Sequence, residues 1–541
     1  MGYPDSMMES IKKLEATREF RMRQKIPILS LEEKNQLLRD FHPDYRPEVH
    51  REILIGVNKG DMAVNEFVDL LEAKSYIEPD KINLEDIFVS TDVLIIGGGG
   101  AGLTAALFSN DAGARVVIVT KLRLGDSNTT MAEGGMNAAI SPGDSPVMHY
   151  IDTMGGGNFT NISSLVWALA LDSPIIVKWL EDLGVPFDRN ADSELPALML
   201  VGGHSRPRVC GVGDYTGMTI MQILRAEVEK RAIQVLEFSP AVELITDEYG
   251  QCVGAIIFNF ENNQYQIIKS KITIIATGGI GRLHIQSFPT TNHYGATADG
   301  LIIAYRAGAK LGYMDSIQFH PTGTAYPEQL LGLLVTEGSR GRGAQLVDVD
   351  GERYINELQT RDLVASAIVR QVIGRKKGIT TPSGKQGVWL DTPLIDIING
   401  EGTVQKYFSH SYHRFKKYGI DFFKEPILVY PAQHYQNGGV ITDDMGKSNV
   451  PNLYVVGEAA GGVHGRNRLG GNSLSDLFVF GRRAGIQVGR EFRDIKIGKL
   501  TLTHVVKYHQ ELKNAGIENG RKSPVLLPDY RFEKSFPVIQ Q

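Results

Sequence analysis

The spacing of apolar residues predicts helices at the start of the chain. Residues 1–90 are rich in charged side chains, and their apolar positions recur at helical intervals. Ser30 and Glu33 form a capping-box pattern ahead of one apolar run, and residues 61–77 place apolar side chains on one broad helical face. We therefore expect residues 1–90 to form a helical arm, which either packs on the main body or docks to a partner subunit.

The hydrophobic pattern changes at Asp92. Residues 93–96 form a continuous apolar run typical of a buried strand, and a glycine cluster follows directly at 97–102. A helix is expected over 103–112 and a second buried strand over 115–119. This order predicts a β–turn–α–β unit, the start of a dinucleotide-binding fold.

The glycine cluster fits the G-x-G-x-x-G pattern of such folds. Gly97 permits the tight turn, Gly99 lets the backbone approach a pyrophosphate, and Gly102 packs the helix against the strand. The helix N-terminus then binds phosphate through its free N–H groups and its dipole. Lys121 stands where NAD-binding folds usually carry an acid, so plain NAD binding is disfavoured. Lys121 is either an ordinary surface lysine or a neighbour of the adenosine half of the nucleotide.

Two later segments repeat the order of a strand followed by glycine. Residues 272–279 form one, and residues 453–458, which end in Glu458, form the other. A second turn that returns to the nucleotide and a late Gly-Glu that meets the ribitol hydroxyls resemble flavoproteins with two dinucleotide folds. Together with the first glycine cluster, these segments predict FAD binding.

Composition and charge exclude several other classes of protein. The chain has 541 residues, a formal net charge of −5 and only two cysteines, Cys210 and Cys252. Two cysteines cannot ligate an iron–sulfur cluster or complete a zinc site, so we expect no metal. The net negative charge argues against a nucleic-acid surface. No apolar run is expected to reach the ~20 residues of a membrane span. We expect a cytoplasmic protein that is peripheral to a membrane only through a partner.

A long ordered series of motifs makes the resemblance to one family specific. The motifs, in chain order, are 127–139 (SNTTMAEGGMNAA), 318–323 (QFHPTG), 336–340 (TEGSR), 360–362 (TRD), 434–435 (HY) and 464–474 (HGRNRLGGNSL). From about residue 91 to residue 488 the chain resembles the flavoprotein subunits of fumarate reductase and succinate dehydrogenase. It is also similar to soluble fumarate reductases and to L-aspartate oxidase.

The resemblance implies an α/β fold with a two-dinucleotide-binding, Rossmann-like FAD domain and an inserted α+β capping domain. The expected boundaries are residues 1–90 for a helical N-terminal arm, 91–315 and 431–489 for the two parts of the FAD domain, 316–430 for the capping domain, and 490–541 for a short C-terminal tail. The family's usual C-terminal helical domain is shortened, which puts in doubt the contacts with an iron–sulfur subunit. The arm is a candidate substitute.

The resemblance also assigns residues to the cofactor. One of them, Asn128, stands where membrane-bound members carry a histidine bonded to the flavin, and an amide cannot make that bond. We therefore expect non-covalent FAD, a lower flavin potential and a preference for fumarate reduction. The residues expected to bind FAD are Gly97, Gly99, Gly102, Lys121, Ser127, Asn128, Thr129, Gly134, Gly135, Ala276, Thr277, Gly278, Asp299, Glu458, Ser473 and Leu474.

Residues matching the family's substrate site support reduction of a C=C bond between two carboxylates. The matching positions that would bind the two carboxylates are His320, Thr336, His434 and Arg468. Arg361 matches the proton donor. A free guanidinium has a pKa above ~12 and is a poor acid, so its proton must be replaced quickly. Glu337 and Arg340, one helical turn apart, match the relay that replaces it, although a plain salt bridge is the alternative interpretation.

Three functions remain open at this stage. The first is a fumarate reductase, or an enzyme that interconverts fumarate and succinate, as the catalytic subunit of a complex in which an iron–sulfur or other electron-transfer subunit supplies electrons. The second is L-aspartate oxidase, which the Gly-Gly-His-Ser run at 202–205 favours, whereas Arg468-Leu-Gly-Gly-Asn favours fumarate reductase. The third is an electron-transfer flavin subunit without dicarboxylate turnover. Arg466 stands where the family usually has a small residue, which indicates a local change near the substrate or a partner.

Overall fold

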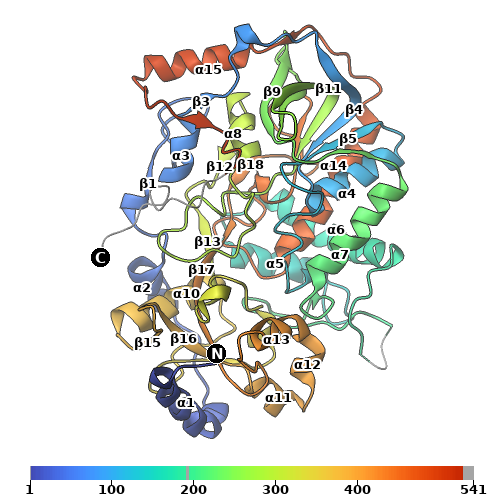
Figure 1. Cartoon of the computed structure of the whole chain (residues 1–541). Helices are drawn as coiled ribbons and strands as arrows, with labels where there is room; N and C mark the ends of the chain where they lie inside the picture. Colours follow the sequence, from blue (N-terminus) through green and yellow to red (C-terminus); the bar gives the residue numbers. More distant parts are fainter. Residues whose placement is uncertain (1, 191–193, 528–541) are drawn as a thin grey trace.

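The computed structural model describes residues 2–190 and 194–527, so the end of the expected C-terminal tail lies outside the described residues. Two sheets organise the chain, a larger one at the top of the view and a smaller one below it (Figure 1). The larger sheet has the strand order β21-β9-β10-β11-β4-β5-β8, with β19 paired to β11. Its strands are β4 (Ile87–Ile96), β5 (Val116–Val119), β8 (Gln234–Leu236), β9 (Ala241–Asp247), β10 (Cys252–Asn259), β11 (Gln264–Ile275), β19 (Leu453–Val455) and β21 (Leu500–Thr501).

The core of the larger sheet is parallel and buried on both faces. Strands β8, β5, β4, β11 and β19 run parallel to one another, whereas β9 and β10 are antiparallel additions. In β4, Val93 and Ile95 pack with one cluster, while Leu94 and Ile96 pack with another on the opposite face. An uninterrupted apolar run is therefore what this strand requires.

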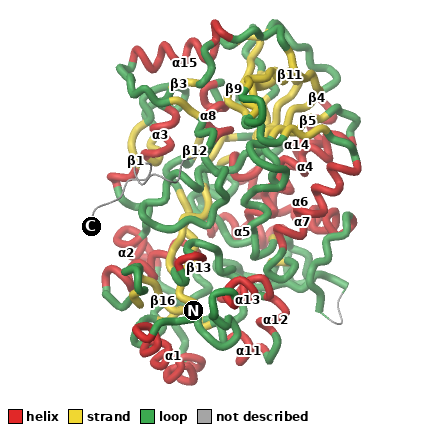
Figure 2. Tube along the Cα trace, viewed as in Figure 1, coloured by secondary structure: helices red, strands yellow, loops and turns green. Residues whose placement is uncertain are grey.

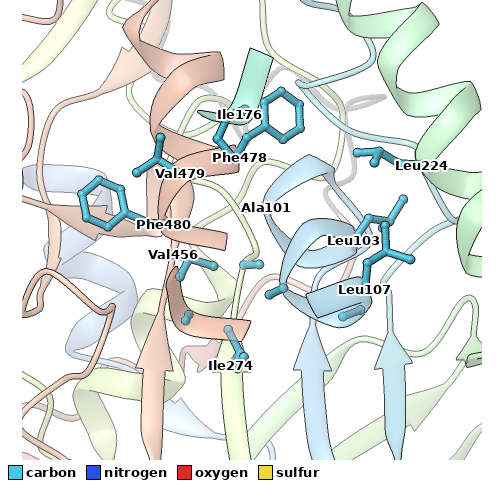
Figure 3. Close-up of a cluster of buried hydrophobic side chains, with 14 of the residues drawn as sticks. Ala101, Leu103, Leu107, Ile176, Leu224, Ile274, Val456, Phe478, Val479 and Phe480 are labelled. Atoms are coloured by element: carbon cyan, nitrogen blue, oxygen red, sulfur yellow. The ribbon is translucent and has the colours of Figure 1, made fainter. Parts of the chain in front are cut away.

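Helices cover both faces of the larger sheet (Figure 2). Ala101 of α4 and Phe478 of α14 share one buried cluster with Ile274 of β11 (Figure 3). A Cβ on Gly485 would lie 2.8 Å from the carbonyl oxygen of Ala105, so glycine lets α14 approach α4 closely. The helices around this sheet are α4 (Gly100–Asp111), α5 (Pro146–Gly156), α6 (Ser163–Asp182), α7 (Thr216–Lys230), α8 (Asp299–Arg306) and α14 (Asn472–Glu491).

The smaller sheet is built from residues 317–436, and we call residues 316–430 the capping region. Its order is β13-β17-β16-β14, with β15 paired to β16, and all pairs are antiparallel. The strands are β13 (Ile317–Thr324), β14 (Gln345–Val347), β15 (Ile379–Thr380), β16 (Gln386–Asp391) and β17 (Ile427–Gln436). The helices are α9 (Gly338–Gly341), α10 (Arg361–Val369), α11 (Leu394–Asn399), α12 (Thr403–Tyr407) and α13 (Ser409–Lys416). This mixture agrees with the expected α+β character.

The described residues before β4, 2–86, correspond to most of the expected N-terminal arm and run along one side of the molecule from the capping region to the larger sheet (Figure 1). Its elements are α1 (Asp5–Arg23), α2 (Leu31–Phe41), β1 (His50–Glu52), β2 (Met62–Val64), α3 (Asn65–Leu71) and β3 (Lys74–Ser75). The capping box of Ser30 and Glu33 is present. The expected helix over 61–77 is wrong in extent, because β2 pairs with β1 and β3 pairs with β22 (Lys522–Ser523).

The C-terminal segment continues the fold after residue 490. Strand β21 adds an edge to the larger sheet, α15 (Thr503–Asn514) packs near β3, and β22 (Lys522–Ser523) pairs in parallel with β3 of the arm. The remaining described strands form three small sheets. One has three strands, β12 (Leu311–Gly312), β18 (Gly439–Ile441) and β20 (Ala460–Gly461), and the other two pair β6 (Met136–Asn137) with β7 (Val209–Cys210) and β1 with β2.

One helix corrects an expectation about membrane spans. By length and composition alone, α6 is apolar enough to cross a membrane, with a mean hydropathy of 1.3. Asp172 interrupts its apolar sequence, which is why no unbroken run is visible. Asp172 accepts hydrogen bonds from Arg483, and the helix packs on α5 and α14, with 56% of the apolar window buried inside the protein. This burial is typical of a core helix.

Candidate functional site

A cavity of about 460 Å³ opens at the carboxyl ends of the parallel strands. Ile96 and Val119 line it at the ends of β4 and β5, and Ala276 and Val456 line it just after β11 and β19. Ligands of open α/β sheets bind at this edge. Of the residues expected in the site, all line the cavity except Gly102 and Arg340, which pack directly behind it.

The glycine turn has the geometry that a dinucleotide requires. Gly97 has φ +123°, and a Cβ there would lie 2.3 Å from the carbonyl oxygen of Ala276. A Cβ on Gly102 would lie 2.0 Å from the carbonyl oxygen of Gly97, so only glycine lets α4 pack on the turn. Helix α4 begins at Gly100 with Gly99 as its N-cap, which aims N–H groups into the cavity wall. The turn fits the diphosphate of FAD.

At the other end of the nucleotide site, Lys121 and Asp299 form an ion pair. Lys121 Nζ lies 2.6 Å from Asp299 Oδ2 and donates to Thr297 Oγ1 at 2.6 Å. Both residues line the cavity, and both side chains are about nine-tenths buried. Lys121 is therefore not an ordinary surface lysine. Its charge is compensated within the protein, and the pair joins the end of β5 to the start of α8.

The loop expected around the isoalloxazine, residues 127–135, is held from two sides. Asn128 Oδ1 accepts from the His293 backbone N–H at 2.6 Å, and its Nδ2 donates to Asn292 Oδ1 at 2.7 Å. A Cβ on Gly135 would lie 2.4 Å from the carbonyl oxygen of Cys210, so the loop packs tightly on β7. The Asn128 amide is thus fixed by hydrogen bonds at the cavity wall.

Glu458 and the start of α14 complete the flavin side. Glu458 Oε1 accepts from the Gln436 backbone N–H at 3.0 Å, and burial raises the pKa of Glu458. A buried carboxyl at this point suits the hydroxyl groups of a ribityl chain, which can donate to it. Ser473 and Leu474 lie in the first turn of α14 beside the cavity. The donor and acceptor set of the whole cavity fits FAD.

Acid precipitation is expected to release all the flavin from the purified protein. The Asn128 amide cannot form the bond that a histidine forms, so only non-covalent contacts hold the cofactor. The measurement is the flavin absorbance of the supernatant against that of the redissolved pellet. A pellet that stays yellow after repeated washing would show a covalent link through some other residue.

At the far end of the cavity, two histidines face each other. The His320 and His434 rings have centroids 5.0 Å apart. His320 Nδ1 accepts from the Thr322 backbone N–H at 3.2 Å, so in the neutral ring the proton is on Nε2. Burial and then the charge of Arg361 hold the pKa of both histidines well below 6.5. They are neutral hydrogen-bond donors or acceptors at neutral pH.

Arg468 presents its guanidinium to the same space. It stacks over the Tyr435 ring at 4.4 Å, and Nη1 donates to the Leu469 carbonyl at 3.1 Å. Its Nε and Nη2 are buried and have no hydrogen-bond partner among the described residues. Burial and then Arg361 lower the pKa of Arg468 to about 9, so it is still charged at neutral pH. Two free donors on a planar cation suit a carboxylate.

Arg361, Glu337 and Arg340 form a continuous buried ion pair network. Arg361 Nη2 lies 2.7 Å from Glu337 Oε2, and Arg340 Nη2 lies 3.2 Å from Glu337 Oε1. Burial alone would raise the pKa of Glu337, but Arg361 and Arg340 overcome it and lower the value to about 2. The expected spacing of Glu337 and Arg340 by one turn is confirmed, since α9 starts directly after Glu337.

Two further polar residues beside the site, Gln318 and Glu133, were not predicted from the sequence. Gln318 Oε1 accepts from Arg361 Nη1 at 3.2 Å, and its Nε2 donates to the Arg468 carbonyl at 2.7 Å. Glu133 of the isoalloxazine loop pairs with Arg414 of α13 at 2.8 Å, and burial raises the pKa of Glu133 to about 7. Two features of the sequence could have indicated them: Gln318 is the first residue of the QFHPTG motif, and Glu133 is a charged residue inside a glycine-rich loop.

Several residues singled out in the sequence stay outside the cavity. Arg466 pairs with Asp315 at 2.8 Å on the surface, so it does not reach the substrate end. His204 Nε2 lies 3.1 Å from the Gly470 carbonyl, behind the cavity wall. Cys210 and Cys252 are buried, and burial raises their pKa values to about 12 and 11. Neither thiol forms a reactive thiolate at neutral pH.

Comparison with known proteins agrees with this geometry. A family model described as FAD binding domain matches residues 92–474. The chain is 39% identical to one of the subunits of fumarate reductase (CoM/CoB) of Methanothermobacter marburgensis, over 75% of this chain and 74% of that one. It is 36% identical to L-aspartate oxidase of Streptomyces coelicolor, over 74% and 68% of the two chains. Among solved structures, the FrdA chain of Escherichia coli quinol fumarate reductase has a TM-score of 0.70 at 30% identity, covering 79% and 74%.

Proposed function

The chain belongs to the FAD-binding oxidoreductase family of fumarate reductase and succinate dehydrogenase flavoproteins, and from this premise we propose that it reduces fumarate to succinate. The enzyme acts on CH–CH groups and uses FAD. One observation supports this choice of substrate: two arginines line the same end of the cavity. Arg468 has two buried donors without a partner, and Arg361 is bound to Glu337.

The proposed chemistry divides between the cofactor and the side chains. When bound, reduced FAD would supply a hydride to one alkene carbon. Arg468, with His320, His434 and Thr336, would bind the two carboxylates and so fix the orientation of the alkene in the cavity. Positive charge fixed beside a carboxylate stabilises the negative charge that develops on the second carbon. Arg361 gives that carbon a proton. The hydride brings the electron pair of the first new C–H bond, and the π pair of the C=C bond, left on the second carbon, forms the second C–H bond with that proton.

The proton that Arg361 loses must be replaced. Glu337 bridges Arg361 and Arg340 through its two carboxylate oxygens, at 2.7 and 3.2 Å. A carboxylate with a low pKa is poor at holding a proton but can pass one between the two cations with which it is paired. We assign Glu337 and Arg340 to this relay, with Arg340 on the side away from the cavity.

L-Aspartate is a second candidate substrate, because L-aspartate oxidases are also relatives of this chain. Its α-ammonium group would need a carboxylate partner in the cavity. The described carboxylates that line the cavity each have at least one charged or backbone partner already: Arg123, Arg414, Lys121, Arg361 or the backbone of Gln436. They are Asp126, Glu133, Asp299, Glu337 and Glu458. This distribution favours a substrate without an ammonium group.

Electrons have to reach the flavin from outside. The relative in Methanothermobacter is one of several subunits by its name, and the Escherichia coli neighbour belongs to a quinol fumarate reductase. The two cysteines of this chain are buried and unreactive, so they offer no route. We propose that an iron–sulfur or other electron-transfer subunit delivers the electrons, and that the chain is cytoplasmic and attached to a membrane only through such a partner.

An anaerobic reoxidation experiment tests the proposal. Photoreduced enzyme is mixed with fumarate, and oxidised enzyme is mixed with L-aspartate, while the flavin spectrum is recorded. We expect rapid reoxidation by fumarate and no reduction by L-aspartate. Reduction by L-aspartate would transfer the assignment to amine oxidation. No response to either compound would leave the chain as an electron-transfer subunit.

A further inference from the structure

The N-terminal arm reaches the wall of the substrate site, although it precedes the matched FAD-binding region at 92–474. Its turn at residues 42–46 lies behind β13. The His42 and Tyr45 rings are tilted by 38° with centroids 4.2 Å apart, and His42 meets Phe319 edge-on at 6.4 Å. Phe319 directly precedes His320. The arm is therefore part of the support behind the proposed substrate-binding strand.

Asp44 in this turn binds two separate segments of the main body. Its Oδ2 accepts from the Ile317 backbone N–H, the first residue of β13, at 3.0 Å. Its Oδ1 accepts from His284 Nε2 at 2.7 Å. Asp44 is 3% exposed and His284 is fully buried, so these bonds are shielded from water. Shielded charge-assisted bonds are stronger than those on the surface.

His284 is held by a carboxylate on each side. Its Nδ1 lies 2.8 Å from Glu66 Oε2 on α3, opposite the bond from Nε2 to Asp44. Carboxylates only accept, so both ring nitrogens donate and the ring is an imidazolium. The other titratable or charged groups that face this cluster are His42, Arg46 and His50. His50 Nε2 lies 3.6 Å from Asp44 Oδ1, and Arg46 donates a hydrogen bond to Gln286.

Each segment bound by the cluster contacts residues proposed to act in the substrate site. On β13, Ile317 is followed by Gln318, which accepts from Arg361 and donates to the Arg468 carbonyl. Seven residues after His284, Thr291 Oγ1 lies 2.7 Å from His434 Nδ1. The two segments are therefore joined at one end by the arm and at the other end by the substrate site.

We propose that Asp44, His284 and Glu66 form a positioning cluster, through which the N-terminal arm sets the separation of β13 and the 284–292 segment and so aligns Arg361 and His434 with the substrate. The inference rests on the proposed function for its effect on turnover. None of the three residues touches the cavity, so they act through Ile317, Gln318 and Thr291.

The stabilisation that protonated His284 gives to the cluster should be lost as the pH rises. Burial alone would lower the pKa of His284, but Asp44 and Glu66 raise it from 6.5 to about 9. Because the folded-state pKa is raised, the stabilisation is fully present below pH 6.5 and is lost as the pH rises through about 9. We expect alignment of the site to weaken over that same window.

Three variants and one control test the proposal in the full chain. In His284→Gln and Asp44→Asn we expect kcat for fumarate to fall about 10- to 100-fold, with a smaller change in KM, because misalignment affects the reacting groups most. Glu66→Gln keeps a hydrogen-bond acceptor but removes a charge, so it should retain more activity and shift the alkaline loss of turnover to lower pH. Asp69→Asn, on the same arm but paired only with surface arginines, should match wild type.

Amide hydrogen exchange separates this proposal from the proposed function. Asp44→Ala removes the acceptor of the Ile317 N–H, so exchange at Ile317 should accelerate even if no fumarate turnover is found. Unchanged exchange at Ile317, or an alkaline limb of the pH profile that is the same in wild type and Glu66→Gln, would overturn the positioning cluster. If wild type shows slow exchange at Ile317 but does not turn over fumarate, the positioning cluster would stand and fumarate would be excluded as the substrate.

Discussion

Arg361→Gln is expected to lower fumarate turnover by about 10²- to 10⁴-fold, the usual contribution of a general acid, while FAD stays bound. Glutamine keeps a planar polar group near Gln318 and Glu337 but has no acidic proton for the second alkene carbon. Steady-state kcat with a reduced artificial donor and the flavin content per chain are the two quantities to measure. A loss in kcat with little change in flavin content would place the defect in proton transfer.

Arg466→Gln is the matched control for this prediction. Arg466 lies two residues from Arg468 in sequence, but its guanidinium pairs with Asp315 at the surface and not with the substrate end. We expect its turnover to stay near that of wild type. If Arg361→Gln kept most of its turnover, or if Arg466→Gln lost as much, Arg361 would not be the proton donor.

Glu337→Gln is expected to combine a loss of turnover with a large loss of stability. The substitution leaves Arg361 and Arg340 buried with no shared carboxylate, and breaking a buried pair in this way costs about 3–5 kcal/mol. It also removes the carboxylate from the proposed relay. Turnover and the free energy of unfolding in denaturant are both measured, with Glu352→Gln as control. Glu352 is exposed and pairs with Lys377 at the surface, a kind of pair that contributes about 0–1 kcal/mol.

The difference in the free energy of unfolding between wild type and Glu337→Gln should depend on pH, which tests whether it comes from the lost ion pair. The pKa of Glu337 is lowered to about 2 from an ordinary value of 4.5. Because it is lowered, the stabilisation by its charge is present above pH 4.5 and is lost as the pH falls through about 2. The gap between wild type and Glu337→Gln should therefore shrink in that window. A gap that does not change with pH would indicate a packing defect instead of a lost ion pair.

Local signals in the sequence predicted the parts of the fold that depend on neighbouring residues. The apolar run of β4 and the glycines at 97 and 102 specify their own backbone geometry, and both lie where they were expected. Helix α4 begins three residues before the expected start, so Gly100 and Gly102 lie in its first turn and not in the preceding loop. Motif spacing likewise brought His320, Thr336, His434 and Arg468 to one cavity.

Features that depend on distant partners could not be predicted in the same way. The shortness of α3 follows from β3 pairing with β22, more than 400 residues later. Glu133 is paired with Arg414 across 281 positions, and Asp44 with His284 across 240. A single sequence shows no sign of such pairs, because an isolated charge in a loop is usually solvated. The assignment of residues 1–90 as an arm was possible, but its contact with the substrate strand was not.

The packing of α1 has a consequence for synthesis on the ribosome. Met7, Ile11 and Leu14 bury their side chains in a cluster with Trp389, and Arg18 and Arg21 bind Asp391, across 373 and 370 positions. At about 5–20 residues per second, the emerging chain waits roughly 20–70 s before these partners are made. Through that interval the first helix has an uncovered apolar face. We expect nascent chains to recruit chaperones early and to lose them only once the capping region has emerged.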